Sequence, residues 1–398
     1  MSGALNNIYN NFNFSLQRHA QAIASLQEQV STGSRINRAS DGPSTGYRIL
    51  GLNSQKRSLG NYMDNISDGM DILEISLTVI DEMGSAISDT KVRLTQIGSG
   101  TYGTGETAQR SREGVATGIN DILEQIVSSA NTERLDQHLF GGSNTSSAPY
   151  VVQRSNGEIT SVTYQGGLQN RDIKIASGVE SSVFYVGDNI FRSNDRSAPV
   201  FCGSSGASAG TGTSSVKGDL WLTVTGSAGN WTLSIDDGAT TFASDGTETN
   251  LAVTNSDGDV LYVDTTAIAS TDVEMVRVPG TYDIFNVLIN IRDVLRNQRN
   301  LSEGTVTDLI VRSADSLGEI KNLLVEQQVA TGTKINFMDT LKDSLEKIKF
   351  DTEDQTTLLQ EADIAQIAID LSRREILYQM SLSVAGKLMS MSLLDFIR

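Results

Sequence analysis

The sequence predicts an α+β protein: a long antiparallel α-helical rod, made of a terminal coiled coil and a helical bundle, with an inserted antiparallel β domain at its tip. Apolar residues recur at steps of three and four at both ends of the chain, which is the spacing of amphipathic helices. The middle of the chain has short β-branched runs separated by glycine, which is typical of strands and turns. Proline is excluded from helix interiors, and it occurs only where this texture changes, at Pro43, Pro149, Pro199 and Pro279.

We therefore expect three domains along the 398 residues. A terminal coiled-coil core domain would comprise 1–43 and 351–398, and a helical rod domain would comprise 44–149 and 280–350. A β-rich outer domain would cover 150–279, with a first β segment at 150–192 and an extra β insertion at 193–279.

The N-terminal helices follow from their apolar spacing. The first has a heptad seam with one polar interruption, at Phe12, Leu16, His19, Ile23, Leu26 and Val30. From Ile49 to Leu94 most positions at such steps are apolar, so we predict a second helix about 68 Å long at 1.5 Å per residue. A third helix is predicted over about 106–139, ending before the paired glycines Gly141 and Gly142.

The C-terminal segment carries a similar apolar stripe from Ile364 to Phe396. A lone helix is marginal in water, and most helix stability comes from packing the apolar face. We therefore expect the two terminal helices to run side by side. The residues predicted to form this assembly and coiled-coil interface are Leu16, Ile23, Leu26, Val30, Ile364, Leu371, Tyr378, Leu382, Leu394 and Phe396.

Strands are predicted across the outer domain wherever β-branched and aromatic residues form short runs between turn residues. The expected strands are Val162–Tyr164, Asp172–Ile175, Val183–Val186, Leu220–Val224, Trp231–Ile235, Leu251–Val253, Val260–Val263 and Val273–Val278. Strands at this spacing favour an antiparallel sandwich or meander. Asp257-Gly258-Asp259 could suggest calcium, but the other ligands of an EF-hand loop are missing, which favours a hairpin turn.

Composition excludes several classes of function. A net charge of −17 argues against binding nucleic-acid phosphates or an anionic membrane surface. Phosphate-loop, serine-hydrolase and zinc-protease motifs are absent, and the single cysteine, Cys202, allows neither an intramolecular disulfide nor a cysteine zinc site. We therefore predict no catalytic residues, no metal site and no cofactor, and we do not expect an enzyme. The first 17 residues are uncharged and polar, so we expect no signal peptide.

A motif after the first helix resembles the N-terminal signature of the flagellin superfamily. The chain follows that signature in STGSRINRASDG (31–42), with glycine in place of the second aspartate. NISDGM (65–70) is similar to the superfamily's N-x-x-D-G-I segment. The resemblance implies a structural role for Arg35, Asn37 and Asp41, at the bend between the terminal coil and the long helix.

Within the superfamily, three segments resemble the hook–filament junction branch, the hook-associated proteins type 3, more than the filament subunits. They are LFGGSNT (139–145), the first β segment with VTYQG (162–166), RDIKIA (171–176) and VGDNIF (186–191), and the ending SLLDF (392–396). The resemblance covers about 1–192 and 281–398, whereas 193–279 matches nothing in the superfamily. The alternative is a filament flagellin subunit.

The resemblance implies a structural adaptor of the bacterial flagellum at the hook–filament junction, where it would link the hook-associated layer to flagellin. The implied partners are a second hook-associated protein, flagellin, and further copies of the chain in a ring or layer. A cytoplasmic export chaperone would bind the C-terminal helix, and the chain would be secreted through the flagellar type III apparatus.

Two other classes of protein also have to be weighed. A coiled-coil chemoreceptor would combine long heptads with a sensing domain, but it needs membrane spans, and no apolar run approaches the roughly 18 residues of a span. A secreted adhesin could use 193–279 to bind glycans, and this role could coexist with the adaptor.

Overall fold

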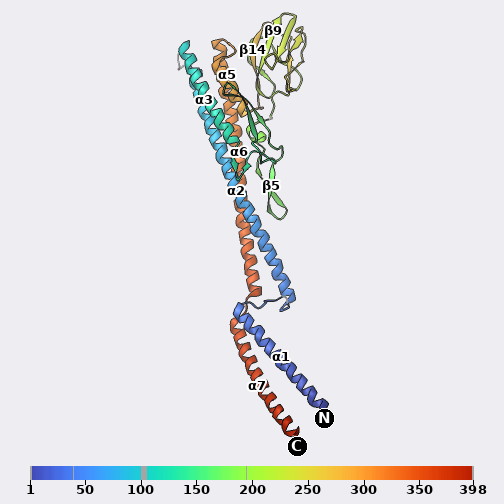
Figure 1. The fold of residues 1–398 in the computed structure, drawn as a ribbon. Coiled ribbons are helices and arrows are strands. Elements are labelled where there is room, and N and C mark those ends of the chain that lie inside the picture. Colours follow the sequence, from blue (N-terminus) through green and yellow to red (C-terminus); the bar gives the residue numbers. More distant parts are fainter. Residues whose placement is uncertain (1, 39, 100–104, 194, 397–398) are drawn as a thin grey trace. The chain divides into compact units, whose positions relative to one another are not determined.

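The structure, a computed structural model, describes residues 2–38, 40–99, 105–193 and 195–396, with side chains from residue 10 to residue 387 of these ranges. Long helices and antiparallel sheets confirm the α+β class (Figure 1). The helices are α1 (Ser2–Thr32), α2 (Pro43–Gly98), α3 (Glu106–Ala130), α4 (Gly187–Phe191), α5 (Ile284–Arg296), α6 (Glu303–Gln360) and α7 (Ile364–Phe396). The chain divides into two compact units, which we call the terminal unit (Met1–Asp64 with Leu341–Arg398) and the central unit (Asn65–Thr340).

In the terminal unit, α1 and α7 lie side by side and run in opposite directions, so both ends of the described chain lie at the same end of the unit (Figure 1). Helix α1 ends at Thr32 because Gly33 takes a left-handed conformation, with φ of 66°. Glycine adopts this conformation without steric cost, and it is a common helix stop.

In the central unit, α2 and α6 run antiparallel to each other. Gln328 of α6 donates a hydrogen bond to Asp81 of α2 at 2.9 Å. Near the C-terminal end of α2, a Cβ built at Gly98 would contact Val311, near the start of α6. The seam predicted for the second helix is buried at every seventh residue, where the relative exposure of Ile66, Leu73, Ile80, Ile87 and Leu94 is 0%. This heptad repeat explains why so long a helix is stable.

The strands all lie in the central unit and pair antiparallel within the described residues. They are β1 (Glu133–Arg134), β2 (Gln137–His138), β3 (Tyr150–Ser155), β4 (Glu158–Tyr164), β5 (Arg171–Ala176), β6 (Val179–Phe184), β7 (Val200–Phe201), β8 (Ser208–Ala209), β9 (Gly218–Ser227), β10 (Asn230–Ser234), β11 (Phe242–Ser244), β12 (Leu251–Thr254), β13 (Val260–Asp264) and β14 (Asp272–Val278). Strands β1–β2, β3–β4 and β5–β6 form two-stranded hairpins. The later strands form a five-stranded sheet, in the order β11-β10-β9-β14-β7, and a three-stranded sheet, in the order β12-β13-β8.

The sequence prediction for the end of the third helix is wrong. Helix α3 stops at Ala130 rather than near 139, and the hairpin β1–β2 follows. The side chain of Asn131 accepts a hydrogen bond from the Tyr150 N–H and donates one to the Tyr150 carbonyl, both at 2.9 Å. This tertiary contact captures the chain directly after α3, and local helical periodicity does not reveal it.

The extra β insertion leaves and rejoins the chain at neighbouring points. The Ser197 N–H donates a hydrogen bond to the Pro279 carbonyl at 2.9 Å. The insertion's hydrophobic cluster, which includes Leu222, Trp231 and Leu261, draws only on residues between Phe201 and Val278. The insertion therefore has a core of its own.

Candidate functional site

The superfamily-like motif forms the connection between α1 and α2 in the terminal unit. The Arg35 N–H donates a hydrogen bond to the Gln360 carbonyl at 2.7 Å, and the Ala362 N–H donates to the Gly33 carbonyl at 3.1 Å. The Arg35 guanidinium also reaches the Leu359 carbonyl, at 3.5 Å. The connection between α1 and α2 is thus bonded to the connection between α6 and α7.

Asp41 and Asn37 fix the shape of this connection from inside. Asp41 Oδ2 accepts hydrogen bonds from the backbone N–H groups of Asn37 and Arg38, at 3.1 and 2.8 Å. Asn37 Oδ1 accepts from Thr32 Oγ1 at 3.0 Å, which ties the loop to the last turn of α1. Arg35, Asn37 and Asp41 are all exposed, and their polar groups serve the turn.

The predicted interface residues fall into two groups along α1 and α7. Five of them are half-buried: Leu16, Ile23, Leu26, Leu371 and Tyr378. Val30, Ile364 and Leu382 are exposed. The side chains of Leu394 and Phe396 lie outside the described residues. The assembly role of these residues stays a prediction.

Sequence reasoning missed a second apolar face on α7. Ile369, Ile376 and Met380 are exposed and are separated by steps of seven and four, so they share a face that lies away from the predicted seam. The same spacing rule applied from Ile369 rather than Ile364 identifies this face. Helix α7 is therefore apolar on two sides, while α1 contacts one of them.

The two terminal helices do not fill the space between them. An open groove of about 570 Å³ lies between α1 and α7, lined by Ala22, Ser25 and Leu26 from α1 and by Asp370, Arg373, Arg374 and Leu377 from α7. Leu377 in this groove is 40% exposed. The helix pair therefore leaves part of its apolar surface uncovered and is an incomplete core.

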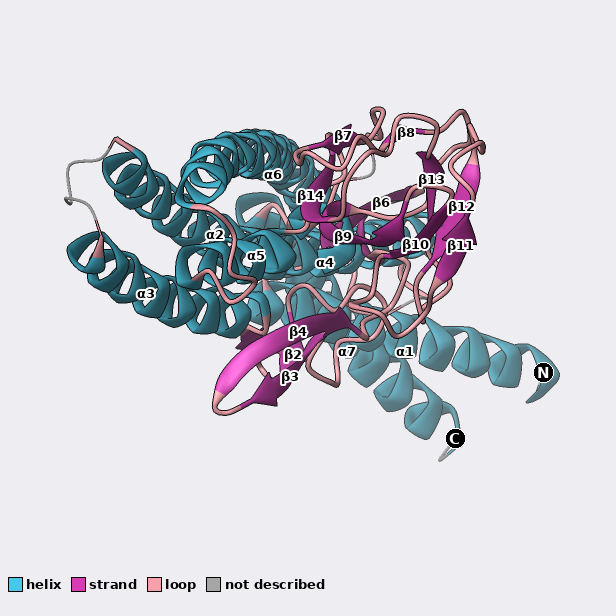
Figure 2. Cartoon of the chain, turned by 90° about the horizontal axis from the view of Figure 1, so that it is seen from above, coloured by secondary structure: helices cyan, strands magenta, loops and turns pink. Residues whose placement is uncertain are grey.

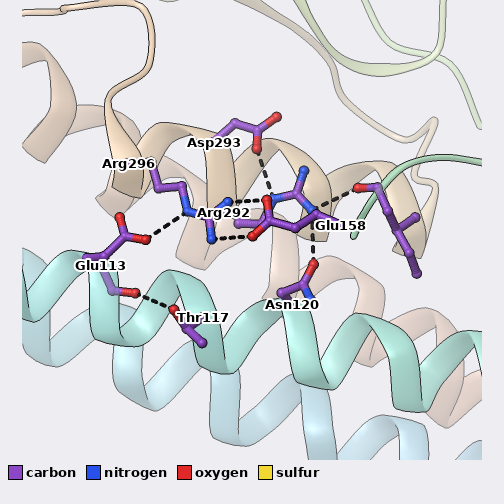
Figure 3. Close-up of polar contacts among 8 residues, drawn as sticks. Glu113, Thr117, Asn120, Glu158, Arg292, Asp293 and Arg296 are labelled. Atoms are coloured by element: carbon purple, nitrogen blue, oxygen red, sulfur yellow. Dashed lines mark hydrogen bonds and ion pairs between the residues drawn. The ribbon is translucent and has the colours of Figure 1, made fainter. Parts of the chain in front are cut away.

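In the central unit, a polar clamp joins α3, α5 and β4 (Figure 3). Arg292, which is 3% exposed, donates to the Ile159 carbonyl at 2.8 Å and to Asn120 Oδ1 at 3.1 Å. One turn later, Arg296 forms a two-pronged ion pair with Glu158, with Nη2 to Oε1 at 2.6 Å, and its Nε lies 3.2 Å from Glu113 Oε1. Its hydrogen bonds hold the pKa of Glu158 below the usual value.

Sequence reasoning also missed the polar clamp, although the sequence contains a feature that indicates it. Arg292 follows Leu288 by four residues and precedes Leu295 by three, so a charged residue occupies the apolar face of an amphipathic helix. Buried charges need partners, and the partners come from α3 and β4. The arrangement fixes the β3–β4 hairpin on the helices.

The described residues offer neither a membrane span nor a metal centre. No helix among them combines the length and the apolar character needed to cross a membrane. Nowhere in the same ranges do three or more His, Cys, Asp or Glu side chains gather closely enough to hold a metal ion.

Comparison with known proteins identifies the N-terminal part of the chain. Residues 4–145 match the model of the bacterial flagellin N-terminal helical region. The chain is 30% identical to Flagellin A of Helicobacter pylori over 139 residues, which are 35% of this chain and 26% of that protein. It is 24% identical to flagellar hook-associated protein 3 of Salmonella typhimurium over 169 residues, 42% of this chain and 50% of the relative. The chain thus spans half or less of the length of these relatives.

Solved structures share the fold over more of the chain. The flagellar hook associated protein-3 of Legionella pneumophila is 14% identical, with a TM-score of 0.53, covering 78% of this chain and 98% of its own. FlgL of Xanthomonas campestris is 16% identical, with a TM-score of 0.51, covering 76% and 98%.

The N-terminal part of the chain thus matches the bacterial flagellin N-terminal helical region, and the fold is similar to that of the two solved flagellar proteins. The segment that carries the motif connects α1 to α2, and α1 contacts α7. The sequence match to flagellar hook-associated protein 3 extends over 42% of the chain, against 35% for the match to Flagellin A.

Proposed function

We propose that the chain is a structural adaptor of the bacterial flagellum that joins the hook-associated layer to the flagellin filament. The observation that carries this proposal is the terminal unit, where large apolar side chains of α1 and α7, such as Phe14, Ile369 and Ile376, are exposed. An incomplete core of this kind is stabilised when neighbouring subunits cover the remaining faces. The Arg35, Asn37 and Asp41 connection would hold the two helices at the spacing that the neighbours require.

The proposed partners are a second hook-associated protein, flagellin, and further copies of this chain. Before export, a cytoplasmic chaperone would cover the C-terminal helix, because the face formed by Ile369, Ile376 and Met380 is exposed in the free chain. Export would then proceed through the flagellar type III apparatus. We propose no catalytic role, metal or cofactor.

A deletion strain tests the adaptor role. Without the chain, cells should keep their hooks but shed flagellin into the medium, because the layer that holds the filament is missing. In the wild type, a tag placed in the β insertion should label one band at the base of each filament. Restoring the gene should restore filament attachment.

A filament subunit is the second candidate, since residues 4–145 match the flagellin N-terminal region. The same labelling separates the two functions, because a filament subunit would be labelled along the whole filament. Suppose that the whole filament is labelled, and that the deletion strain lacks filaments and releases no flagellin into the medium. These results would contradict the adaptor function and show that the chain is a filament subunit.

A further inference from the structure

The tip of the hairpin β1–β2 holds a large apolar residue in an unfavourable backbone conformation. Leu135 and Asp136 connect the two strands, with φ of 51° and 59°. Such a turn prefers asparagine, aspartate or glycine, and the left-handed conformation costs an ordinary residue about 1–2 kcal/mol. The Leu135 side chain is 85% exposed, so burial does not compensate. Strain of this kind is retained where a residue serves an interaction.

A groove of about 350 Å³ lies beside this tip, and we call it the hairpin groove. Ile72 of α2 and Phe184 of β6 contribute apolar walls. The Arg171 guanidinium lies 5.1 Å above the centre of the Phe184 ring, and its Nη1 donates hydrogen bonds to two neutral oxygens, Gln137 Oε1 at 3.2 Å and Thr145 Oγ1 at 3.4 Å. The groove, which Asp68 also lines, thus combines an apolar anchor, Leu135, with the positive charge of Arg171, whose hydrogen-bond partners are neutral.

The outer face of α6 has the complementary character. Val325 and Val329 are exposed and lie on one side of the helix, since residues four apart are about one turn apart. Asp315 and Glu326 flank this apolar stripe, are exposed, and have no cationic partner within the described ranges. Leu317 and Leu324, which point to the opposite side of the helix, are buried.

The groove and the outer face of α6 cannot meet within one copy of the central unit. Figure 2 shows α6 and the β2–β4 strands on opposite sides of α5. Along the helices, the groove lies at the level of Met338, because its residue Gly69 is next to the Met338 sulfur. Val325 is 13 residues away from Met338 on α6, which corresponds to a shift of roughly 20 Å.

We propose that the hairpin groove binds the outer face of α6 of a second copy of this chain. Leu135 would insert beside Val325, and Arg171 would pair with Glu326 or Asp315. Such a contact joins two different surfaces of the chain, so each copy can bind the next one in the same way. Because the two surfaces lie at different levels along α6, each copy is displaced along the helix axis relative to its neighbour, and the layer is staggered. The inference rests on the proposed function, because a subunit of an axial layer has such neighbours.

Cysteine cross-linking tests this contact in the full chain. In a Cys202→Ser background, Leu135→Cys with Val325→Cys should give, on mild oxidation, a ladder of cross-linked oligomers, both in concentrated purified protein and in isolated flagella. The control pair is Leu135→Cys with Val151→Cys. Val151 on β3 is 42% exposed, against 43% for Val325, and lies outside both surfaces. The control pair should stay monomeric.

Charge reversal tests the ion pair. Arg171→Glu should lower the cross-linked yield by about tenfold, and Glu326→Arg in the same chain should restore it. No cross-link in purified protein, although both thiols react with maleimide, would overturn the docking surface, as would dimers without a ladder. A protein that cross-links in solution but is absent from flagella would overturn the proposed function and leave the docking surface standing.

Discussion

Glu274 places a carboxyl group inside the β insertion, where it is 2% exposed. Its Oε1 accepts a hydrogen bond from Ser205 Oγ at 2.6 Å, while Oε2 is a buried oxygen without a partner among the described residues. Burial, helped by the charge of Asp272, raises the pKa of Glu274. The folded state therefore binds this proton more tightly than the unfolded state, and stability from this group is lost as the pH rises from the ordinary glutamate value through the raised one.

We expect Glu274→Gln to remove the loss of stability that the ionisation of Glu274 causes as the pH rises. At pH 4 the variant and the wild type should have similar free energies of unfolding, whereas at pH 8 the variant should be more stable by about 1–2 kcal/mol. Urea unfolding across this pH range measures the difference.

Glu248→Gln is the control with the opposite sign, because hydrogen bonds, chiefly from Ser244, lower the pKa of Glu248 to about 2. Its removal should cost stability at neutral pH, and this cost should fade as the pH falls toward 2. Parallel curves for wild type and Glu274→Gln would contradict the expected ionisation.

Leu135 offers a second test at a single residue. Leu135→Asn should raise the stability of the central unit by about 1 kcal/mol, because asparagine tolerates the left-handed conformation that Leu135 adopts. If Leu135 anchors a neighbouring copy, the same variant should assemble less well. Thermal unfolding and filament retention measure the two effects, and a variant that gains in both would deny the side chain any role in assembly.

At the scale of helices and hairpins, two glycines of α2 give opposite expectations. A Cβ at Gly69 would lie 2.6 Å from Ile173 Cδ1 and 3.1 Å from Val183 Cγ1, so Gly69 lets the β5–β6 hairpin approach the helix. Nothing lies within 4 Å of a Cβ at Gly84. Gly84→Ala should stabilise the central unit by up to about 1 kcal/mol through helix propensity. Gly69→Ala should destabilise it by about 1–3 kcal/mol through overpacking. Thermal unfolding of the two single variants decides the sign, and a stabilising Gly69→Ala would mean that the hairpin can shift freely.

Periodicity was sufficient to predict the long helices, because burial in α2 repeats at every seventh residue from Ile66 to Leu94. It was insufficient where a distant partner decides the structure. The hydrogen bonds between Asn131 and Tyr150 capture the chain directly after α3. Arg292 can be buried because Asn120 Oδ1 and the Ile159 carbonyl accept hydrogen bonds from its guanidinium. The second apolar face of α7, formed by Ile369, Ile376 and Met380, was overlooked because the stripe that starts at Ile364 was already sufficient to predict a helix there.

At the scale of the whole molecule, the β insertion should be dispensable. Its core draws on its own residues, and polar bonds attach it to the helices, such as Arg277 to the Arg312 carbonyl and Asn290 to the Asp219 carbonyl, both at 2.7 Å. Replacing 197–278 with a short Gly/Ser linker should therefore leave export, polymerisation and filament attachment intact. Motility and filament retention in the altered strain measure this.

The matched control replaces a part of the β region that contacts the helices directly. Removing 172–183 from the β5–β6 hairpin takes away Ile173 and Val183, which face Gly69, and Ser182, which accepts a hydrogen bond from Lys334 at 3.0 Å. That variant should lose filament attachment. Normal secretion with lost filaments in the 197–278 replacement would instead show that the insertion contacts neighbouring subunits.

The backbone bond between Ser197 and Pro279 also makes this position an exchange point. Its two chain ends are as close as neighbouring strands, which are about 5 Å apart. A foreign domain with similarly spaced ends, such as a small enzyme or an antigen, could be joined there without stretching the helices. Every copy in an assembled layer would then display one cargo molecule, so the chain would become a periodic carrier whose cargo spacing is set by subunit contacts.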